Sequence, residues 1–221
     1  MKAYFHRQIQ LWGEEKQNTL QNKKIAIIGC GGLGCSLGIA LGSSGIGEII
    51  LVDFDKVELH NIHRQIAFTQ NDIGQYKCQA LANVITKRSP FVHVKTLTDD
   101  FESFSKEAHE VDLIIDATDN LPTRAKIDNY AKQTKTPWIY GSVEEFHGQV
   151  CFFDESNFSA FNISDKKPEG IAAPIVMFIA SLQANLALRY LVDLEIKKDL
   201  LYYLYFDNSG ELITQKFAMP K

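Results

Sequence analysis

Cysteine is scarce in this chain, and its spacing excludes two classes of protein. The 221 residues include four cysteines, Cys30, Cys35, Cys78 and Cys151, and no two of them form a C-x-x-C pair. The usual spacing of a zinc ribbon is therefore absent, and four cysteines in a chain of this size do not form a disulfide framework. We expect reduced thiols in the core, where free cysteines usually lie.

An excess of basic residues is also lacking. The 23 Lys and Arg are outnumbered by 27 Asp and Glu, the formal net charge is -4, and the basic residues are scattered along the chain. Because a nucleic-acid surface needs clustered positive charge, no nucleic-acid partner is expected. The hydrophobic share of 45% and the charged share of 23% are typical of one globular domain with a well-filled core, and we expect residues 1–221 to form it.

A leader and a membrane-spanning segment are not recognisable either. The chain does not open with positive charge followed by an apolar run and a small-residue cleavage site, so a cytoplasmic location is expected. The one long apolar stretch, residues 172–192, is interrupted by Ser181, Gln183, Asn185 and Arg189. This composition favours a buried helix over a membrane span, and no membrane partner is expected.

Strand-like and helix-length segments alternate through the first two-thirds of the chain. Strands are predicted at 24–29, 48–53, 92–97, 111–117 and 137–141, with helices between them at 33–43, 77–88 and 123–134. This order is typical of a parallel sheet covered by helices. After residue 141, the β-rich segments 149–153, 201–206 and 212–217 surround the long apolar helix, so antiparallel strands are expected to continue the sheet. The predicted fold class is α/β, a Rossmann-like mixed sheet.

Two further segments lie outside these elements. Residues 1–22 precede the first strand and are expected to form an N-terminal helical arm. Residues 157–173 mix Ser, Asn, Asp, Lys, Pro and Gly with little periodicity, which predicts a long surface loop. Long loops of this kind are often mobile lids, but a plain connection fits the composition equally well.

The first predicted strand runs into a glycine-rich turn. Gly29, Gly31, Gly32 and Gly34 lie in the sequence Gly-Cys-Gly-Gly-Leu-Gly, directly before a helix. Glycines let the backbone approach a phosphate closely, and the N–H groups and dipole at the helix start attract its charge. Asp53 ends the second strand about 20 residues on, where a carboxylate accepts ribose hydroxyls. A nucleotide is therefore favoured over a purely structural turn.

The residues that follow Asp53 bear on which nucleotide is bound. Arg64 and Lys77 come after the second strand, and Asp116 to Asn120 close the fourth. A hydride-transfer site needs no fixed cations on the cofactor phosphates, whereas displacing pyrophosphate from ATP needs cations where negative charge grows. ATP is therefore favoured over a nicotinamide dinucleotide. No acid–base pair can be placed opposite a hydride acceptor, which further disfavours an oxidoreductase.

In order along the chain, these motifs resemble the adenylating family of ThiF, MoeB and HesA, bacterial relatives of ubiquitin-activating enzymes. Residues 5–13 resemble the R-Q-I-x-L-x-G opening of that family. The glycine loop, D-F-D at 53–55, N-x-x-R-Q at 61–65, G-Q-x-K at 74–77, T-D-N at 118–120 and S-L-Q-A at 181–184 follow. The resemblance covers nearly the whole chain and rests on no single motif.

The resemblance implies a reaction and a partner. In this family, a carboxylate attacks the α-phosphate of ATP, giving an acyl adenylate and pyrophosphate. The carboxylate implied here is the C-terminus of a ubiquitin-like sulfur-carrier protein ending in Gly-Gly, for thiamine-thiazole or molybdopterin synthesis. The sequence leaves open which of the two pathways applies.

The resemblance also implies roles for residues of this chain. The backbone around Gly32 holds phosphate, Asp53 binds the ribose, and Asp119 holds Mg2+, a hard cation suited to carboxylate oxygens. Arg64 and Lys77 stabilise the charge that grows as the bond between the α- and β-phosphates breaks. The remaining cofactor-binding residues implied by the resemblance are Gly29, Gly31, Gly34, Asn61, Gln65 and Asn120.

A homodimer is implied as well, because Arg7 resembles the arginine that family members supply across the dimer interface. Structural alternatives exist for several of these residues. Arg64 and Lys77 fit solvated surface charges, and Arg7 fits a surface salt bridge. Asp116 is favoured as a structural carboxylate at the strand end, which leaves the metal to Asp119.

The chain departs from the family pattern at its cysteines. Most relatives carry two C-x-x-C pairs that bind a structural zinc, and several carry a loop cysteine that forms a thioester or persulfide with the carrier. Neither pair is present, and residues 157–173 include no cysteine. No structural zinc is therefore expected, and a separate protein is expected to supply the sulfur.

Other functions are compatible with the same motifs. The carboxylate could belong to a tRNA base or a peptide, although the weak basic character argues against tRNA. The chain could also be a nucleotide-binding subunit without catalysis, like the inactive halves of eukaryotic activating heterodimers. The presence of Arg64, Lys77 and Asp119 together argues against that interpretation.

Metal analysis of the purified protein tests the zinc prediction. Because thiolate pairs of the usual spacing are missing, we expect far less than one zinc ion per chain by plasma mass spectrometry. A stoichiometric zinc ion that stays bound through dialysis against a chelator would contradict this prediction and show that other side chains bind the metal.

Overall fold

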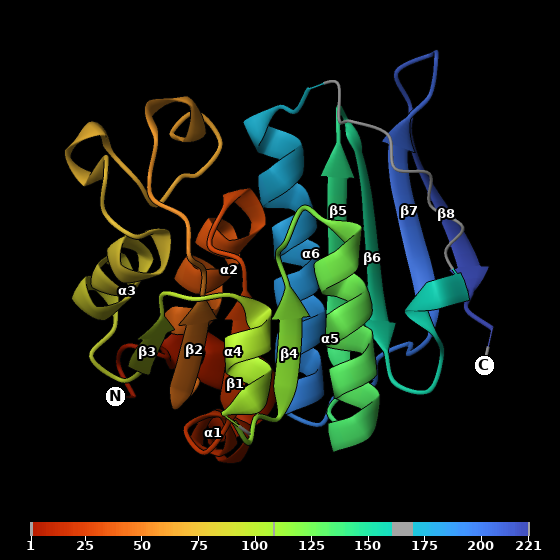
Figure 1. The fold of residues 1–221 in the computed structure, drawn as a ribbon. Helices are drawn as coiled ribbons and strands as arrows, with labels where there is room; N and C mark the ends of the chain where they lie inside the picture. The colour runs from red at the N-terminus through yellow and green to blue at the C-terminus, as the bar shows by residue number, and fades with distance from the viewer. Residues whose placement is uncertain (1, 108, 161–169, 221) are drawn as a thin grey trace.

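The computed structural model describes residues 2–107, 109–160 and 170–220, and its centre is an eight-stranded sheet (Figure 1). The strands are β1 (Lys24–Ile28), β2 (Glu48–Val52), β3 (His93–Leu97), β4 (Leu113–Asp116), β5 (Trp138–Glu144), β6 (His147–Phe153), β7 (Leu200–Phe206) and β8 (Leu212–Ala218). They lie in the order β3-β2-β1-β4-β5-β6-β7-β8. The helices are α1 (His6–Leu20), α2 (Gly32–Gly42), α3 (Lys77–Arg88), α4 (Phe101–Lys106), α5 (Leu121–Thr134) and α6 (Ala173–Leu191). Short 3-10 helices are η1 (Leu59–Asn61), η2 (Gln70–Asp72) and η3 (Phe158–Ala160).

The first half of the sheet is parallel, as predicted. β3, β2, β1, β4 and β5 pair in parallel, with β1 between β2 and β4. Ile25 of β1 lies opposite Ile49 on one side and Leu113 on the other. Four consecutive residues are buried in each of β1, β2 and β4, because helices cover both faces of a parallel sheet. The unbroken apolar runs in the sequence follow from this double burial.

The second half of the sheet is antiparallel, which confirms the predicted mixed α/β fold. β5 turns back into β6, and β7 and β8 follow in antiparallel pairs. β5 continues past residue 141, where the sequence pattern predicted its end, because pairing with β6 extends to Glu144 opposite His147. β8 forms the edge of the sheet, and most of its residues are exposed.

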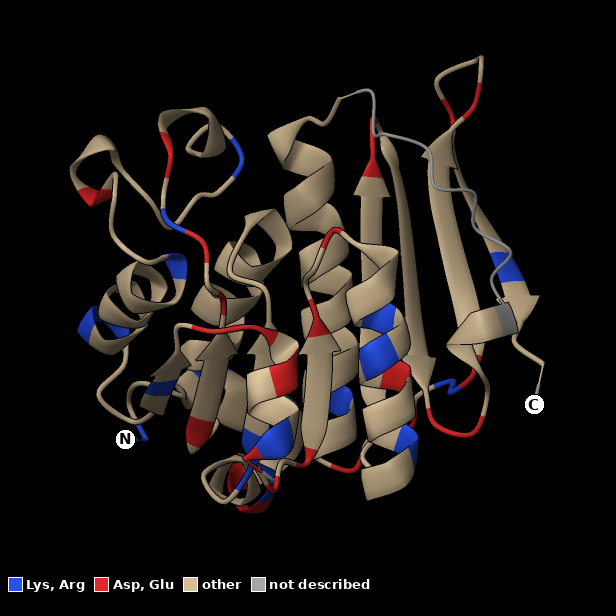
Figure 2. Ribbon diagram, in the orientation of Figure 1, with Lys and Arg blue, Asp and Glu red and all other residues tan. Residues whose placement is uncertain are grey.

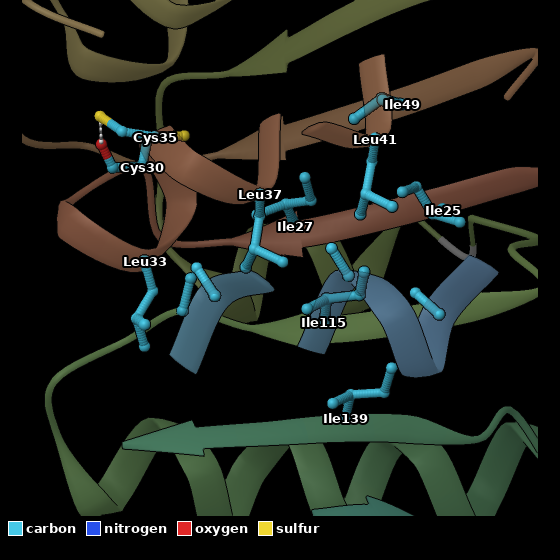
Figure 3. Close-up of a cluster of buried hydrophobic side chains, with 14 of the residues drawn as sticks. Ile25, Ile27, Cys30, Leu33, Cys35, Leu37, Leu41, Ile49, Ile115 and Ile139 are labelled. Atoms are coloured by element: carbon cyan, nitrogen blue, oxygen red, sulfur yellow. Dashed lines mark hydrogen bonds between the residues drawn. The ribbon is translucent and has the colours of Figure 1, made fainter. Parts of the chain in front are cut away.

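Two buried clusters cover the two faces of the sheet. On one face, α2, α3 and α6 contribute side chains such as Leu37, Leu81 and Ile179. Figure 3 shows part of this cluster, with leucines of α2 close to isoleucines of the central strands. On the other face, α4 and α5 contribute Phe104 and Ile127, and Figure 1 shows these two helices in front of the sheet with α6 behind it. The sheet is therefore the middle of three layers.

α6 is the long apolar helix that the sequence predicts. Its buried side includes Ile175, Ile179 and Gln183. Within the described ranges, it is the one helix whose length and composition would suffice to cross a membrane, and 50% of its most apolar window is buried inside the protein. A helix packed in a protein core passes the same test, so this property is weak evidence for a membrane span.

α1 forms the predicted helical arm and packs at the amino ends of β1 and β2. Gly13, with a φ of 86°, kinks the helix. Gln17 is 2% exposed, and its Nε2 donates to the Ser44 carbonyl oxygen at 3.0 Å. A β-carbon at Gly47 would lie 1.9 Å from the carbonyl oxygen of Gln21. The close approach of the two backbones therefore requires glycine just before β2.

The structure describes the two ends of the segment 157–173, which follows β6. Residues 157–173 are predicted as a surface loop, but η3 lies in this range, and Phe158 is 6% exposed. The ring centroid of Phe158 lies 5.7 Å from that of Trp138 and 5.5 Å from that of Tyr140. A single aromatic residue carries no periodicity, so the sequence pattern could not show this burial. Residues 161–169, where the mobile loop is predicted, lie outside the described residues.

One carboxylate organises the chain immediately after β6. Asp199 accepts the backbone N–H groups of Asp154, Glu155 and Ser156 at 3.0, 3.2 and 3.2 Å. It also accepts the Ser156 hydroxyl at 2.7 Å. Burial raises the pKa of Asp199, but these hydrogen bonds lower it by more, so the pKa lies below the usual aspartate value. The charged form of Asp199 therefore stabilises the fold.

We expect Asp199→Asn to lower the free energy of unfolding by about 1 kcal/mol near neutral pH, since the partly exposed carboxylate loses its charge-assisted hydrogen bonds. The contribution is complete above the pKa of an unfolded aspartate, about 3.9, and disappears as the pH falls through the lower pKa of the folded state. Urea unfolding of variant and wild type at neutral pH and at low pH measures the difference.

Asp207→Asn is the matched control, because Asp207 accepts the N–H groups of Ser209 and Glu211 in the exposed hairpin between β7 and β8. We expect a smaller loss for this variant, since solvent competes for those bonds. A deficit of Asp199→Asn that is as large at low pH as at neutral pH would show that the charge of Asp199 is not what stabilises the segment.

Candidate active site

The carboxyl ends of β1 and β4 bring two loops into direct contact. Gly29, which follows β1, has a φ of 94°, and a β-carbon there would lie 2.6 Å from the Ala117 carbonyl oxygen. A β-carbon at Gly34 would lie 2.1 Å from the Gly29 carbonyl oxygen. Both positions therefore require glycine for close approach. The glycine loop lies against the turn after β4.

The glycine loop ends in an open helix start. α2 begins at Gly32, and no side chain caps it. Gly31 and Gly32 are partly exposed. The first N–H groups of a helix have no partner within the helix, and together with the dipole they favour an anion. The geometry at this end of α2 suits a phosphate group.

Asp53 lies directly behind the glycine loop, one residue beyond the end of β2. Its carboxylate accepts the backbone N–H of Cys30 at 2.6 Å and that of Asp55 at 2.7 Å. Burial raises the pKa of Asp53 above its usual value, although these two hydrogen bonds and the charge of Lys77 oppose the rise. The Asp53 carboxylate is therefore hydrogen-bonded to the glycine loop, the same loop that suits a phosphate.

Lys77, the first residue of α3, faces the same place. It is 7% exposed, and its Nζ lies 2.7 Å from Oδ2 of Asp55. The alternative that Lys77 is a solvated surface charge is therefore wrong, because the side chain is buried and paired. Its charge acts on Asp53 and on Cys30 of the glycine loop. The ammonium group of Lys77 is therefore close enough to act electrostatically on a phosphate at the start of α2.

The segment between β2 and α3 folds over the glycine loop. Nε2 of Gln65 lies 3.5 Å from the point that a β-carbon of Gly31 would occupy. The carbonyl oxygen of Arg64 lies 3.7 Å from the corresponding point at Gly32. Gln65 is 3% exposed, and its Oε1 is buried without a hydrogen-bond partner in the part of the chain that the structure describes. The predicted residue Gln65 therefore meets the loop, with a polar atom left unpaired.

Two other predicted residues of this segment bind their own turn. Asn61 is 5% exposed, and its Oδ1 accepts the N–H of Glu58 at 3.0 Å. Nη1 of Arg64 donates to the His60 carbonyl oxygen at 3.2 Å and lies 3.0 Å from Nε2 of His63. Figure 2 shows basic and acidic residues mixed in this segment. The Arg64 guanidinium therefore makes hydrogen bonds within its own turn.

The turn after β4 carries the predicted metal ligand. Asp119 is exposed, and its carboxylate has no hydrogen bond or ion pair to the described residues. Asn120 caps α5, with its Oδ1 accepting the N–H of Thr123 at 2.9 Å. Within residues 2–107, 109–160 and 170–220, no group of three or more His, Cys, Asp or Glu side chains could hold a metal ion. Mg2+ needs only one or two carboxylates together with phosphates and water, so Asp119 fits this cation.

Asp116, by contrast, is not free to bind a metal. It is 0% exposed, and its Oδ2 lies 3.0 Å from Nε of Arg124. This ion pair agrees with the structural interpretation of Asp116. Sequence reasoning missed Arg124, because a single arginine in a helix has no local signal of burial. It also gave no role to Gln183, whose Nε2 donates to the Asp116 carbonyl oxygen at 2.8 Å.

Comparison with known families agrees with this arrangement. A family model described as the ThiF family matches residues 5–221. The chain belongs to the ThiF family. It is 32% identical to the molybdopterin-synthase adenylyltransferase of Escherichia coli (strain K12), over 85% of this chain and 81% of that protein. It is 30% identical to the sulfur carrier protein ThiS adenylyltransferase of the same organism, over 81% of this chain and 76% of that protein.

Longer relatives and solved structures complete the comparison. The adenylyltransferase and sulfurtransferase MOCS3 of Dictyostelium discoideum is 33% identical over 78% of this ThiF-family chain, which spans 44% of that protein's length. The structure of E. coli MccB with ATP has a TM-score of 0.85 at 21% identity, over 99% of this chain and 72% of that one. PaaA gives 0.85 at 23% identity, over 100% and 74%. The names of these relatives are those of adenylyltransferases, and the solved structures confirm the fold.

Arg7 lies apart from the site that the other ThiF-type residues form. It is exposed on α1, and its Nη1 donates to Oε1 of Gln10 at 3.2 Å. α1 packs at the amino ends of β1 and β2, as Figure 1 shows, whereas the glycine loop follows the carboxyl end of β1. The structure therefore does not bring Arg7 together with the glycine loop of the same chain.

The thiols of this ThiF-family chain are all in the interior. Cys30, Cys35, Cys78 and Cys151 are free and buried, which confirms the core prediction. Burial raises the pKa of Cys35 to about 12 and that of Cys78 to about 11. It also raises the pKa values of Cys30 and Cys151. Because the thiolate is the reactive form, these thiols are poor nucleophiles near neutral pH.

A double-mutant cycle tests the pairing of Lys77 with Asp55. We expect Asp55→Asn to lower the free energy of unfolding by about 1 kcal/mol, because it leaves the buried ammonium of Lys77 without its charged partner. In a Lys77→Met background, the same substitution should cost much less. Urea unfolding of the four proteins gives the coupling energy, and a coupling energy near zero would show that the pair makes no net contribution.

Proposed function

We propose that this chain uses ATP and Mg2+ to adenylate the C-terminal carboxylate of a ubiquitin-like sulfur-carrier protein that ends in Gly-Gly. The proposal rests on one observation, that four features lie together at the carboxyl ends of the parallel strands. These are the glycine loop with its open helix start, the carboxylate of Asp53, the buried Lys77 and the exposed Asp119. The relatives' names support a sulfur carrier as substrate, and both thiamine-thiazole and molybdopterin synthesis fit this chemistry.

The described residues at the carboxyl ends of these strands suit ATP. The start of α2 receives phosphate oxygens, and Asp53 accepts ribose hydroxyls. Gln65, whose Nε2 lies beside Gly31 and whose Oε1 is buried without a partner among the described residues, supports a ligand here, since buried polar atoms normally have a partner. Asp119 holds Mg2+, which neutralises phosphate charge when bound.

The proposed reaction forms one bond and breaks one. A carboxylate oxygen of the carrier attacks the α-phosphorus, the bond from that phosphorus to the pyrophosphate oxygen breaks, and pyrophosphate leaves. Lys77 and Arg64 stabilise the negative charge that grows on the phosphate oxygens. Lys77 is paired with Asp55 at 2.7 Å and Arg64 with its own turn, so the phosphates compete with these partners.

A homodimer and a separate sulfur donor belong to the same proposal. Arg7 is part of α1, which lies at the end of the sheet opposite the glycine loop (Figure 1), so in the proposed homodimer the arginine at the phosphates comes from the second copy. The buried cysteines offer no accessible thiolate. The carrier therefore leaves as an acyl adenylate and receives its sulfur from another protein.

ATP–pyrophosphate exchange tests the proposed reaction. We expect exchange that requires both Mg2+ and a carrier with a free C-terminal Gly-Gly, and we expect Asp119→Ala to reduce it at least about 100-fold while the protein stays folded. The measurement is incorporation of labelled pyrophosphate into ATP, with circular dichroism to check the fold.

Glu102→Ala is the matched control, because Glu102 is a half-exposed carboxylate on α4, paired with Lys126 at the surface. It should keep the exchange activity of the wild type. Full activity of the Asp119→Ala enzyme would show that another carboxylate binds the metal. No exchange with any ThiS- or MoaD-like carrier would reject the proposed substrate.

A further inference from the structure

A buried polar cluster lies directly beneath the turn that carries Asp119. Arg124 of α5 is 5% exposed, and Asp116 at the end of β4 is 0% exposed. Nε of Arg124 lies 3.0 Å from Oδ2 of Asp116. Nη2 of the same guanidinium donates to two carbonyl oxygens, that of Thr118 at 2.7 Å and that of Gly141 at 3.1 Å. One side chain therefore joins β4, β5 and the turn between β4 and α5.

The turn is held from two further sides. Oδ1 of Asp116 accepts the backbone N–H of Thr118 at 2.9 Å and its hydroxyl at 2.6 Å. Gln183 of α6 is 0% exposed and donates to the Asp116 carbonyl oxygen at 2.8 Å. Ala117 lies against Gly29 of the glycine loop. The backbone is therefore fixed from Asp116 to Thr118, and Asp119 is the next residue along the chain.

Stability alone does not explain a buried ion pair at this place. Burying a guanidinium and a carboxylate carries a large desolvation penalty, and apolar residues of similar volume often hold a helix to a sheet equally well. Apolar side chains cannot donate hydrogen bonds to the carbonyl oxygens of Thr118 and Gly141. The planar guanidinium can donate to several acceptors in fixed directions, which a lysine ammonium does not do. The cluster therefore determines the geometry of the turn.

We infer that Arg124 is a positioning residue that, through Asp116 and Thr118, holds the Asp119 carboxylate in place for Mg2+ beside the glycine loop. The inference rests on the proposed function, because Mg2+ at Asp119 is part of that proposal. Groups that orient a metal ligand typically change metal affinity or activity by about 10- to 100-fold when they are removed.

Two variants separate the charge of Arg124 from its geometry. Arg124→Lys keeps a positive charge next to Asp116 but cannot reach both carbonyl oxygens. The double variant Asp116→Asn with Arg124→Gln removes both charges, so no buried charge is left unpaired. The matched control is Asp128→Asn with Lys132→Gln. That ion pair, at 2.6 Å, lies on the same helix but nearer its C-terminal end.

The first measurement is the Mg2+ concentration that gives half-maximal ATP–pyrophosphate exchange. We expect it to rise about tenfold or more in both Arg124 variants and to stay within about twofold of the wild type in the control. The second measurement is hydrogen–deuterium exchange of the peptide that covers residues 116–121. We expect faster uptake there in both Arg124 variants, with unchanged uptake over β2. A residue that only stabilises the fold would lower the thermal midpoint and speed deuterium uptake but leave the Mg2+ requirement unchanged.

An unchanged Mg2+ requirement and unchanged deuterium uptake of the turn in both Arg124 variants would overturn the inference. The wild-type enzyme separates this failure from a failure of the proposed function. If the wild type itself shows no exchange with any carrier, the proposed function is rejected, and the deuterium uptake of the turn alone then decides whether Arg124 holds it.

Discussion

The contact between Gly29 and Ala117 is the constraint on which the rest of the site depends. β1 lies between β2 and β4 in the sheet, so the loops that leave these strands diverge at their carboxyl ends, where ligands of open α/β sheets usually bind. A side chain at Gly29 would push the glycine loop away from the turn after β4. The loop would then lose its position relative to Asp119. The start of α2, which suits a phosphate, lies near Asp119, the proposed Mg2+ ligand, because the backbones at Gly29 and Ala117 are in contact.

Buried charges around this contact are balanced within the protein. Lys77 pairs with Asp55, and Arg124 pairs with Asp116. An unpaired charge in the interior would be strongly destabilising. Asp119, whose carboxylate has no partner in the described part of the chain, is exposed to water instead. The buried charges of the site are thus neutralised within the protein, and an exposed carboxylate lies at the position where a cation is proposed.

The segment after β6 is organised by carboxylates. Asp199 collects the N–H groups of residues 154–156. Asp128 accepts the indole N–H of Trp138 and the backbone N–H of Phe158, both at 3.3 Å, and pairs with Lys132. Here two acidic side chains and the burial of Phe158 order residues 154–158.

The sequence by itself determined the order and type of the main elements, because unbroken apolar runs and glycine turns are local signals. It missed α4, which is too short to show a period, and the burial of Phe158. For the site, it determined which residue types follow which strand, and the structure brings the glycine loop, Asp53, Gln65 and Lys77 together. Only the tertiary structure decided that Lys77 is buried against Asp55 and that Arg7 lies at the far end of the sheet. The same holds for the hydrogen bonds that Arg124 and Gln183 donate to Asp116 at the end of β4. These contacts join residues far apart in the chain, 22 positions for Lys77 and Asp55 and 67 for Gln183 and Asp116, and no local pattern encodes which side chains meet when the layers pack.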